Sequence, residues 1–460
     1  MVARGLSRLS IAALQVTWAW ACKESTGGPG SQVITVQPSV MYQTMNGWEA
    51  TAQAGQWECA GFSNYKNQLY DTAAHDLGIN RLRVELTSGS ENPTDYFAQF
   101  RSGLITFPQY MQHAFEVVND NNDPALINPN GFHFSAVDDV MDSVVLPLRQ
   151  RLQARGEQLY INLNFVDGDS TLYRQSPAEY AEFMVAAFQH LQSRYGFVPD
   201  AVELVLEPDN TGSQAWTATQ VGNAMVAAGD RLKSLGFTPD FIAPSNASMA
   251  GAVTYFDQLI QVPGASNYVR ELSYHRYNSV SDASLLAIGS RAEQRGIRAA
   301  MLEHIGSDYN DLQKDLTLAR NSAWQQFTLG FCGTNDIGGA YYKIDNTNPS
   351  SPVLIIGSRT KLLRQYFKFV RRGAVRIGAT SKDATFSPLA FVNANGKYVV
   401  VVSASAGGQF SVGSLPAGTY GIKYTTGTQY DVDAADVTLG AGAALNTSIP
   451  ASGVLTIYAK

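Results

Sequence analysis

Two glutamates directly follow short apolar segments that have the pattern of buried strands. Glu207 comes after residues 201–206 (AVELVL), and Glu303 comes after residues 298–302 (RAAML). Two carboxyl groups at strand ends that meet on one face can divide the work of proton transfer and nucleophilic attack, as cleavage of a glycosidic bond requires. The pair therefore predicts a site for this chemistry, provided that the fold brings both strand ends together.

The chain around these glutamates alternates short apolar strands with amphipathic helical segments. Helical patterns cover, for example, residues 137–155, 177–195 and 218–235. We expect strands at residues 45–49, 80–86, 159–165, 201–206, 241–245, 271–275, 298–302 and 339–343. Eight such alternations over residues 43–372 predict an α/β fold, a (β/α)8 TIM barrel, whose active site lies at the carboxyl ends of the strands. In this count Glu207 ends the fourth strand and Glu303 the seventh.

The sequence after residue 372 is typical of a different architecture. Strand patterns continue from 373 to 460 with no helical period, and residues 393–396 (NANG) carry an Asn-Gly hairpin signal. We therefore expect a C-terminal β-sandwich over 373–460, joined by an N-terminal strand at 33–42. Residues 87–134 are long for a connection, which predicts an elaborated loop above the active face.

Composition narrows the classes of function. The 460 residues have a net charge of −6 with only 16% charged residues, and 11% are aromatic. A nucleic-acid-binding protein needs a basic face, so this balance disfavours that class. A low-charge, aromatic-rich chain suits an exported protein that handles neutral ligands. No CxxC or HExxH motif occurs, so we expect neither a metal ion nor another cofactor.

The first residues have the pattern of an export signal. Arg4 and Arg8 precede a short apolar stretch that ends at Ala21-Cys22, and residues 23–32 resemble a flexible linker. Residues 1–22 therefore predict a secreted or cell-surface protein. Cys22 is a candidate for a lipid anchor of the bacterial lipoprotein type, and plain secretion is the alternative.

The two remaining cysteines are predicted to be unbridged. Cys59 follows the first barrel strand and would lie on the upper face. Cys332 precedes the expected eighth strand at 339–343 and would lie on the lower face. Bridged Cα atoms must lie within about 7 Å, and the two faces of a barrel are farther apart than that.

Three further motifs give the chain a specific resemblance. They are residues 42–48 (YQTMNGW), 367–377 (FKFVRRGAVRI) and 390–398 (AFVNANGKY). With the two glutamates, they resemble the retaining glycoside hydrolases of clan GH-A, and glycoside hydrolase family 30 in layout. The resemblance covers most of residues 33–460. It implies a barrel with a side β-sandwich, and cleavage of β-glycosidic bonds in an oligo- or polysaccharide by double displacement.

The resemblance also assigns roles to single residues. It makes Glu207 the acid/base and Glu303 the nucleophile. Residues 273–277 (SYHRY) resemble the pattern of the sixth strand, in which His275 or Tyr277 would hold the nucleophile. Arg83 would lie beside Glu303 and keep it ionised, while an apolar environment would keep Glu207 protonated.

One position departs from the clan's pattern. The clan places Asn directly before the acid/base, where it holds the sugar 2-hydroxyl, and this chain has Leu206. Asn210 and Asn246 are candidates to replace that contact, and Asn164 is a further candidate for sugar hydroxyls. Trp48 and Tyr342 are candidates for stacking on sugar rings.

Two kinds of alternative remain open. A barrel of family 39, 44 or 79 would keep the same two glutamates in the same roles. A surface protein that binds glycans without cleaving them is the alternative outside the enzymes. Leu206 favours that second alternative, whereas the presence of both glutamates favours a hydrolase.

Overall fold

The computed structural model describes residues 33–168, 171–210, 215–333 and 337–460. The predictions for residues 1–32, including the signal segment, the linker and Cys22, lie outside this part of the chain. Among the described residues, no helix combines the length and apolarity needed to cross a membrane.

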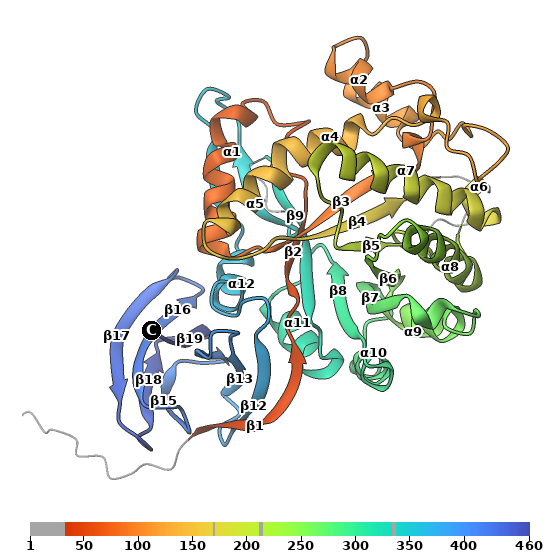
Figure 1. Cartoon of the computed structure of the whole chain (residues 1–460). Coiled ribbons are helices and arrows are strands. Elements are labelled where there is room, and N and C mark those ends of the chain that lie inside the picture. Colours follow the sequence, from red (N-terminus) through yellow and green to blue (C-terminus); the bar gives the residue numbers. More distant parts are fainter. Residues whose placement is uncertain (1–32, 169–170, 211–214, 334–336) are drawn as a thin grey trace, which may run out of the picture.

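Eight parallel strands close into a barrel, which confirms the predicted α/β TIM-barrel fold (Figure 1). The last barrel strand, β9, pairs with both β8 and the first strand, β2, and so closes the ring. The strands are β2 (Gly47–Thr51), β3 (Arg81–Thr87), β4 (Tyr160–Val166), β5 (Ala201–Glu203), β6 (Asp240–Ser248), β7 (Val269–Asn278), β8 (Arg298–Glu303) and β9 (Ala323–Cys332).

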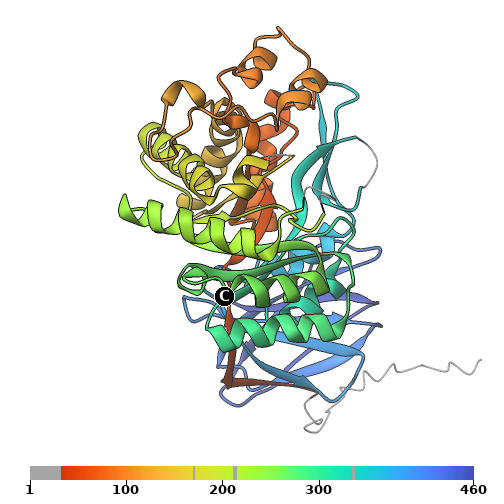
Figure 2. The same cartoon turned by 90° about the vertical axis from the view of Figure 1, so that its right-hand side faces the viewer.

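Helices surround this barrel, and Figure 2 shows several of them side by side. Helix α7 packs on α8, α8 on α9 and α9 on α10, which covers the outer faces of the middle strands. The longer helices are α1 (Phe62–Asp71), α5 (Leu146–Gln153), α7 (Pro177–Tyr195), α8 (Ala218–Ser234), α9 (Met249–Leu259), α10 (Asp282–Arg295) and α12 (Thr360–Phe367). The shorter ones include η1 (Thr72–Leu77), α4 (Ser135–Val140), η4 (Met141–Val145), α6 (Thr171–Gln175), η6 (Ala265–Asn267), α11 (Tyr309–Lys314) and η7 (Asp315–Ala319).

The barrel interior combines paired charges with a small apolar cluster. Side chains alternate along a strand, so Leu82 and Val84 of β3 join the apolar core, while Arg81 and Arg83 point inward. Arg81 pairs with Glu49 of β2 and Glu271 of β7, and all three are fully buried. Burial raises the pKa of Glu49 to about 7, although Arg81 lowers it. Ion pairing is what makes these buried charges tolerable in the folded state.

The predicted eighth strand is wrong. Residues 339–343 fall on β10 (Ala340–Asp345), which pairs with β9 outside the ring and continues into β11 (Val353–Ile356). The eighth barrel strand is β9, over residues that the sequence pattern had not assigned to a strand. Its Gln325 faces the interior and donates to Thr51, so its inward side is polar and the apolar run is interrupted.

A second, nine-stranded and mostly antiparallel sheet forms the side β-sandwich (Figure 1). Strand β1 (Ile34–Thr44) pairs antiparallel with β12 and parallel with β15, and the chain then enters the barrel at β2. An apolar core of its own, including Ile34, Val402 and Ile457, lies inside this sheet. Its other strands are β12 (Val375–Ser381), β13 (Phe386–Val392), β14 (Tyr398–Ala404), β15 (Gly408–Gly413), β16 (Gly418–Thr426), β17 (Val432–Leu439), β18 (Leu445–Ile449) and β19 (Gly453–Ala459).

The first part of the connection between β3 and β4, residues 88–134, carries short helices above the end of β3 (Figure 1). They are η2 (Ser88–Ser90), α2 (Tyr96–Arg101), α3 (Phe107–His113) and η3 (Pro129–Gly131). A small apolar cluster of Phe97, Tyr110 and Ala114 holds α2 and α3 together.

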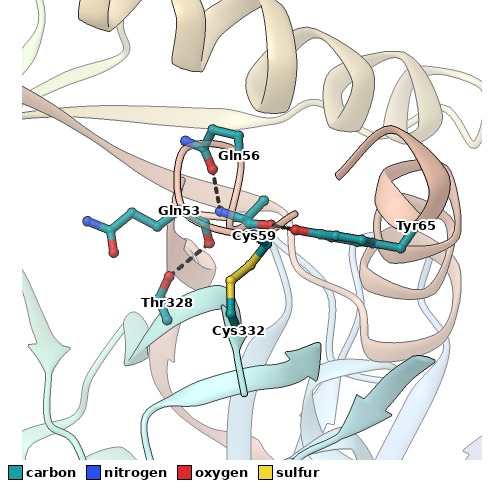
Figure 3. Close-up of a disulfide and its surroundings, with 7 residues drawn as sticks. Gln53, Gln56, Cys59, Tyr65, Thr328 and Cys332 are labelled. Carbon is teal, nitrogen blue, oxygen red and sulfur yellow. Dashed lines mark hydrogen bonds between the residues drawn. A yellow bond between two sulfur atoms is a disulfide. The ribbon is translucent and has the colours of Figure 1, made fainter. Parts of the chain in front are cut away.

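A disulfide joins Cys59 to Cys332, so the prediction of unbridged cysteines is wrong (Figure 3). The two Cα atoms are 5.6 Å apart. The error follows from the mistaken eighth strand: Cys332 is the last residue of β9, so it lies at the upper face beside the loop after β2. Thr328 of β9 also donates to the Gln53 carbonyl at 2.8 Å, which fixes the same loop.

Candidate active site

Glu207 lies just beyond β5, the fourth barrel strand, in a turn that the neighbouring strand holds. The Glu207 amide donates to the Ser245 carbonyl of β6 at 3.2 Å. Two residues on, the Asp209 carboxylate accepts the amides of Ala247 and Ser248 at 2.8 and 3.1 Å. Glu207 has φ 46°, a left-handed conformation that is uncommon outside glycine. These bonds hold the turn in that conformation and direct the Glu207 side chain at the barrel mouth.

Glu303 is the last residue of β8, the seventh barrel strand, and its carboxylate has two strong partners. Tyr277 donates its hydroxyl to Oε1 at 2.8 Å, and Arg83 donates from Nη2 to Oε2 at 2.5 Å. Burial raises the pKa of Glu303, but Arg83, His275 and Tyr277 together lower it below the ordinary value for Glu. Glu303 is therefore ionised across the neutral range.

Glu207 has different partners. Nδ1 of His275 lies 2.8 Å from Oε1, and Asn210 donates its amide to Oε2 at 2.7 Å. The expected apolar environment is thus replaced by an imidazole and an amide, which fix the orientation of the carboxyl group. Of the two candidates for holding the nucleophile, Tyr277 contacts Glu303 and His275 contacts Glu207.

The two carboxyl groups are close to one another. One ligand atom each of Glu207, His275 and Glu303 lies within 4.8 Å of the others. Such a trio has the donor types of a metal site. However, Arg83, Tyr277, His275 and Asn210 already contact these carboxylates, and a guanidinium against Glu303 opposes a second cation there.

The two further asparagine candidates lie inside the barrel. Asn164 is on β4 and Asn246 is on β6, both with no exposed surface. Neither side-chain amide has a hydrogen-bond partner within the described structure. Buried amides are nearly always paired, so both require a partner from a ligand or from water.

The structure does not bring Trp48 and Tyr342 to this group. Trp48 points out of the barrel, and its ring stacks on that of Phe367 of α12 with 4.3 Å between the ring centroids. Its indole N–H donates to the Val370 carbonyl. Tyr342 is buried on β10, outside the ring, because the eighth barrel strand is β9. Both are parts of the apolar core.

Two further residues at the site were not singled out from the sequence. Asp209 anchors the Glu207 turn, and it lies only two residues after Glu207 in the sequence. Glu85 lies two residues after Arg83 on β3, so both point inward, and its Oε1 is 3.5 Å from Arg83 Nη2. That spacing on one strand is a signal that could have identified Glu85.

Comparisons with solved structures place this fold beside known carbohydrate-active enzymes. A GH30 endoxylanase from Clostridium papyrosolvens C71 superposes with a TM-score of 0.66 at 16% identity, covering 93% of this chain and 99% of that one. An endo-β1,6-glucanase superposes with a TM-score of 0.61 at 17% identity, covering 94% and 95%. A conserved exported protein from Bacteroides fragilis superposes with a TM-score of 0.66 at 13% identity, covering 93% of this chain and 100% of that one.

These likenesses extend over both sheets, so the chain shares with these solved structures the fold of a barrel with a side β-sandwich. No protein-family model matches the chain, and no curated protein matches it in sequence.

Proposed function

We propose that this protein is a retaining glycoside hydrolase that cleaves β-glycosidic bonds of an oligo- or polysaccharide. Glu303 is the nucleophile and Glu207 the general acid/base. The observation that carries the proposal is the proximity of two carboxyl groups with unlike partners at the barrel mouth. Oxygens within 4.8 Å favour retention, because inverting enzymes leave room for water with carboxyl groups about 6.5–9.5 Å apart.

Each carboxyl group suits its proposed step. In the first step Glu303 attacks the anomeric carbon while Glu207 protonates the leaving oxygen, which gives a covalent glycosyl ester on Glu303. In the second step Glu207 takes a proton from water, the water attacks the anomeric carbon, and the ester bond to Glu303 breaks. Arg83 and Tyr277 keep Glu303 ionised for attack, and His275 and Asn210 orient Glu207.

Leu206 has no polar side chain to hold the sugar 2-hydroxyl, and three asparagines are proposed to supply such contacts instead. Asn164 and Asn246 have unpaired amides in the barrel, and Asn210 is exposed beside Glu207. We propose that these three residues bind sugar hydroxyls. Leu206 contributes its backbone amide to the Phe165 carbonyl, so its position in the turn is structural.

We also propose that the protein is exported and comprises a catalytic barrel over 43–372 with a β-sandwich over 33–42 and 373–460. The disulfide supports export, because such bonds persist in oxidising compartments. Cys22 remains the proposed lipid-attachment site.

The test is a panel of 4-nitrophenyl β-glycosides and neutral polysaccharides, read by nitrophenol and reducing-end release. The wild-type protein, Glu207→Gln and Glu303→Gln are compared, with Glu293→Gln as a control at an exposed helix position. We expect activity in the wild type and the control, and a loss of about 10³-fold or more in Glu303→Gln on every substrate. Glu207→Gln should lose about as much on polysaccharides but less in the first step on 4-nitrophenyl glycosides, because that leaving group needs little protonation. A wild type that binds glycans without cleaving any would establish the non-catalytic alternative instead.

A further inference from the structure

A third carboxylate lies at the site and has no part in the two proposed steps. Glu85 is on β3 one inward position above Arg83, towards the mouth of the barrel. Its Oε1 is 3.5 Å from the same Arg83 nitrogen that lies 2.5 Å from Glu303. Glu85 and Glu303 are therefore neighbours that share one guanidinium.

Arg83 does not need Glu85 as its counter-ion. Its short contact is with Glu303, and Glu85 adds a second negative charge at a longer distance. Glu203 adds a third, because it acts electrostatically on both Arg83 and Glu85 from within the barrel. Three carboxyl groups thus lie around one guanidinium, and burial together with Glu303 and Glu203 raises the pKa of Glu85, although Arg83 lowers it. Such an arrangement costs stability, which suggests a role in binding.

The Glu85 carboxylate is both held in place and accessible. Gln53 donates to its Oε2 at 3.1 Å, and the Gln53 carbonyl is itself tied to β9 through Thr328. The side chain of Glu85 is 27% exposed, against 11% for Glu303 and 0% for Arg83. It is therefore a fixed acceptor that a ligand can reach.

Asn164 completes this arrangement. It pairs in register with Glu85 across β3 and β4, both point into the barrel, and both atoms of its buried amide lack a partner in the described structure. A carboxylate acceptor beside an amide that donates and accepts matches the adjacent hydroxyls of a sugar ring. It does not match an anionic substituent.

We infer that Glu85 and Asn164 bind hydroxyls of the sugar that becomes attached to Glu303, and that Glu85 restricts this sugar to a neutral one and excludes uronic acids. This inference rests on the proposed function and assigns the substrate class at that site. It also separates this chain from a glucuronidase of the family 79 type, which must accept a carboxylate on the same sugar.

The experiment compares substrates that differ only at C6. kcat/KM is measured for 4-nitrophenyl β-D-glucoside and β-D-glucuronide, and for the galactoside and galacturonide pair. A neutral β-glucan or xylan and a polyuronate give the same comparison on polymers. The proteins are the wild type, Glu85→Gln, Glu85→Asp and the control Glu293→Gln, which removes one negative charge at an exposed position on helix α10. A thermal melt of each variant checks that it is folded.

We expect the wild type to prefer the neutral member by about 100-fold or more, as repulsion between nearby carboxylates implies. Glu85→Gln should lower kcat/KM for the neutral sugar about 10- to 100-fold, since a charged acceptor is replaced by a neutral amide that forms weaker hydrogen bonds. It should also lower the ratio of kcat/KM for the neutral glycoside to kcat/KM for the uronide about tenfold. Glu85→Asp should lose neutral-sugar activity and keep the rejection of uronides, because the charge remains. Glu293→Gln should change neither.

Two results would overturn the inference while leaving the proposed function standing. One is a wild type that cleaves uronides as well as neutral glycosides. The other is a folded Glu85→Gln protein with unchanged kcat/KM and an unchanged ratio. If the wild type cleaves no glycoside of either kind, the proposed function fails and the inference fails with it.

Discussion

The Cys59–Cys332 disulfide offers a prediction whose size follows from the structure. It joins the loop after β2 to the end of β9, across the seam where the barrel closes, and the two cysteines are 273 positions apart in the sequence (Figure 3). Replacing both by serine frees that loop in the unfolded chain. Loop-closure entropy for this length gives a loss of roughly 5–6 kcal/mol in the free energy of unfolding.

The corresponding change in Tm can be estimated from the entropy of unfolding. At about 2.1 cal/mol/K per residue, a folded chain of about 430 residues has an unfolding entropy of about 0.9 kcal/mol/K, so the double variant should melt about 6 °C lower. The measurement is calorimetric or circular-dichroism melting of wild type, Cys59→Ser/Cys332→Ser, and wild type with reductant. Reduced wild type should match the double variant.

A thiol assay provides the independent check. In the denatured, unreduced wild type, Cys59 and Cys332 should not react with a thiol reagent, and reduction should release both. A double variant that melts within about 1 °C of the wild type would refute the entropic argument, since a bond that closes so long a loop cannot be neutral in it. Two reactive thiols at these positions would refute the bridge itself.

Three further outcomes follow from the site. Tyr277→Phe removes a hydroxyl that lowers the pKa of Glu303, so the acid limb of the pH–activity profile should move to higher pH. The variant should also lower kcat/KM about 10- to 100-fold, because Glu303 loses a hydrogen bond. An acid limb at the wild-type pH would contradict this. Burial raises the pKa of Glu49 and of Glu91 to about 7, so between about pH 4.5 and 7 these two groups hold protons in the folded state that they have lost in the unfolded chain. The stability that these two groups contribute should therefore fall over that range, and the Tm of Glu91→Gln should differ from that of the wild type by an amount that changes with pH between about 4.5 and 7; a difference that stays constant contradicts this. Chelation with EDTA should leave activity unchanged, because protein groups already contact the oxygens of Glu207 and Glu303. A loss of activity that added Zn²⁺ or Ca²⁺ restores would establish a metal site instead.

The sequence predicted the barrel, except for its eighth strand, and the position of the two glutamates at its mouth. Short apolar runs precede Glu207 and Glu303. The second run ends with β8, whereas the first continues for three residues past the end of β5. Arg83 and Tyr277 share a strand face with other inward residues, so their meeting at Glu303 follows from alternation along β3 and β7. These features depend on local pattern and on barrel topology, both of which a sequence carries.

The errors have one main physical source, the polar residues that interrupt the apolar pattern of β9. Strand β9 presents Gln325 and Thr328 with its apolar residues, so an apolar-run criterion missed it and moved the eighth strand to 339–343. The misplaced Tyr342 and the missed disulfide both follow from that shift. Trp48 was misjudged for a related reason: Glu49 points inward, so its neighbour must point outward to the core. The partners of Glu207 could not be predicted, because they depend on the turn that Asp209 holds against β6.

The central claim, that Glu303 is the nucleophile of a retaining enzyme, is tested most directly by trapping the covalent intermediate. The protein is incubated with a 2-deoxy-2-fluoro glycoside of its preferred sugar bearing a good leaving group, and the peptides are mapped by mass spectrometry. The 2-fluoro group slows both steps, and the good leaving group lets the first outpace the second, so the glycosyl ester should accumulate. We predict one label, on the peptide that contains Glu303, and none in Glu303→Gln. A label on Glu207, or an active enzyme that inverts configuration and takes no label, would contradict the account.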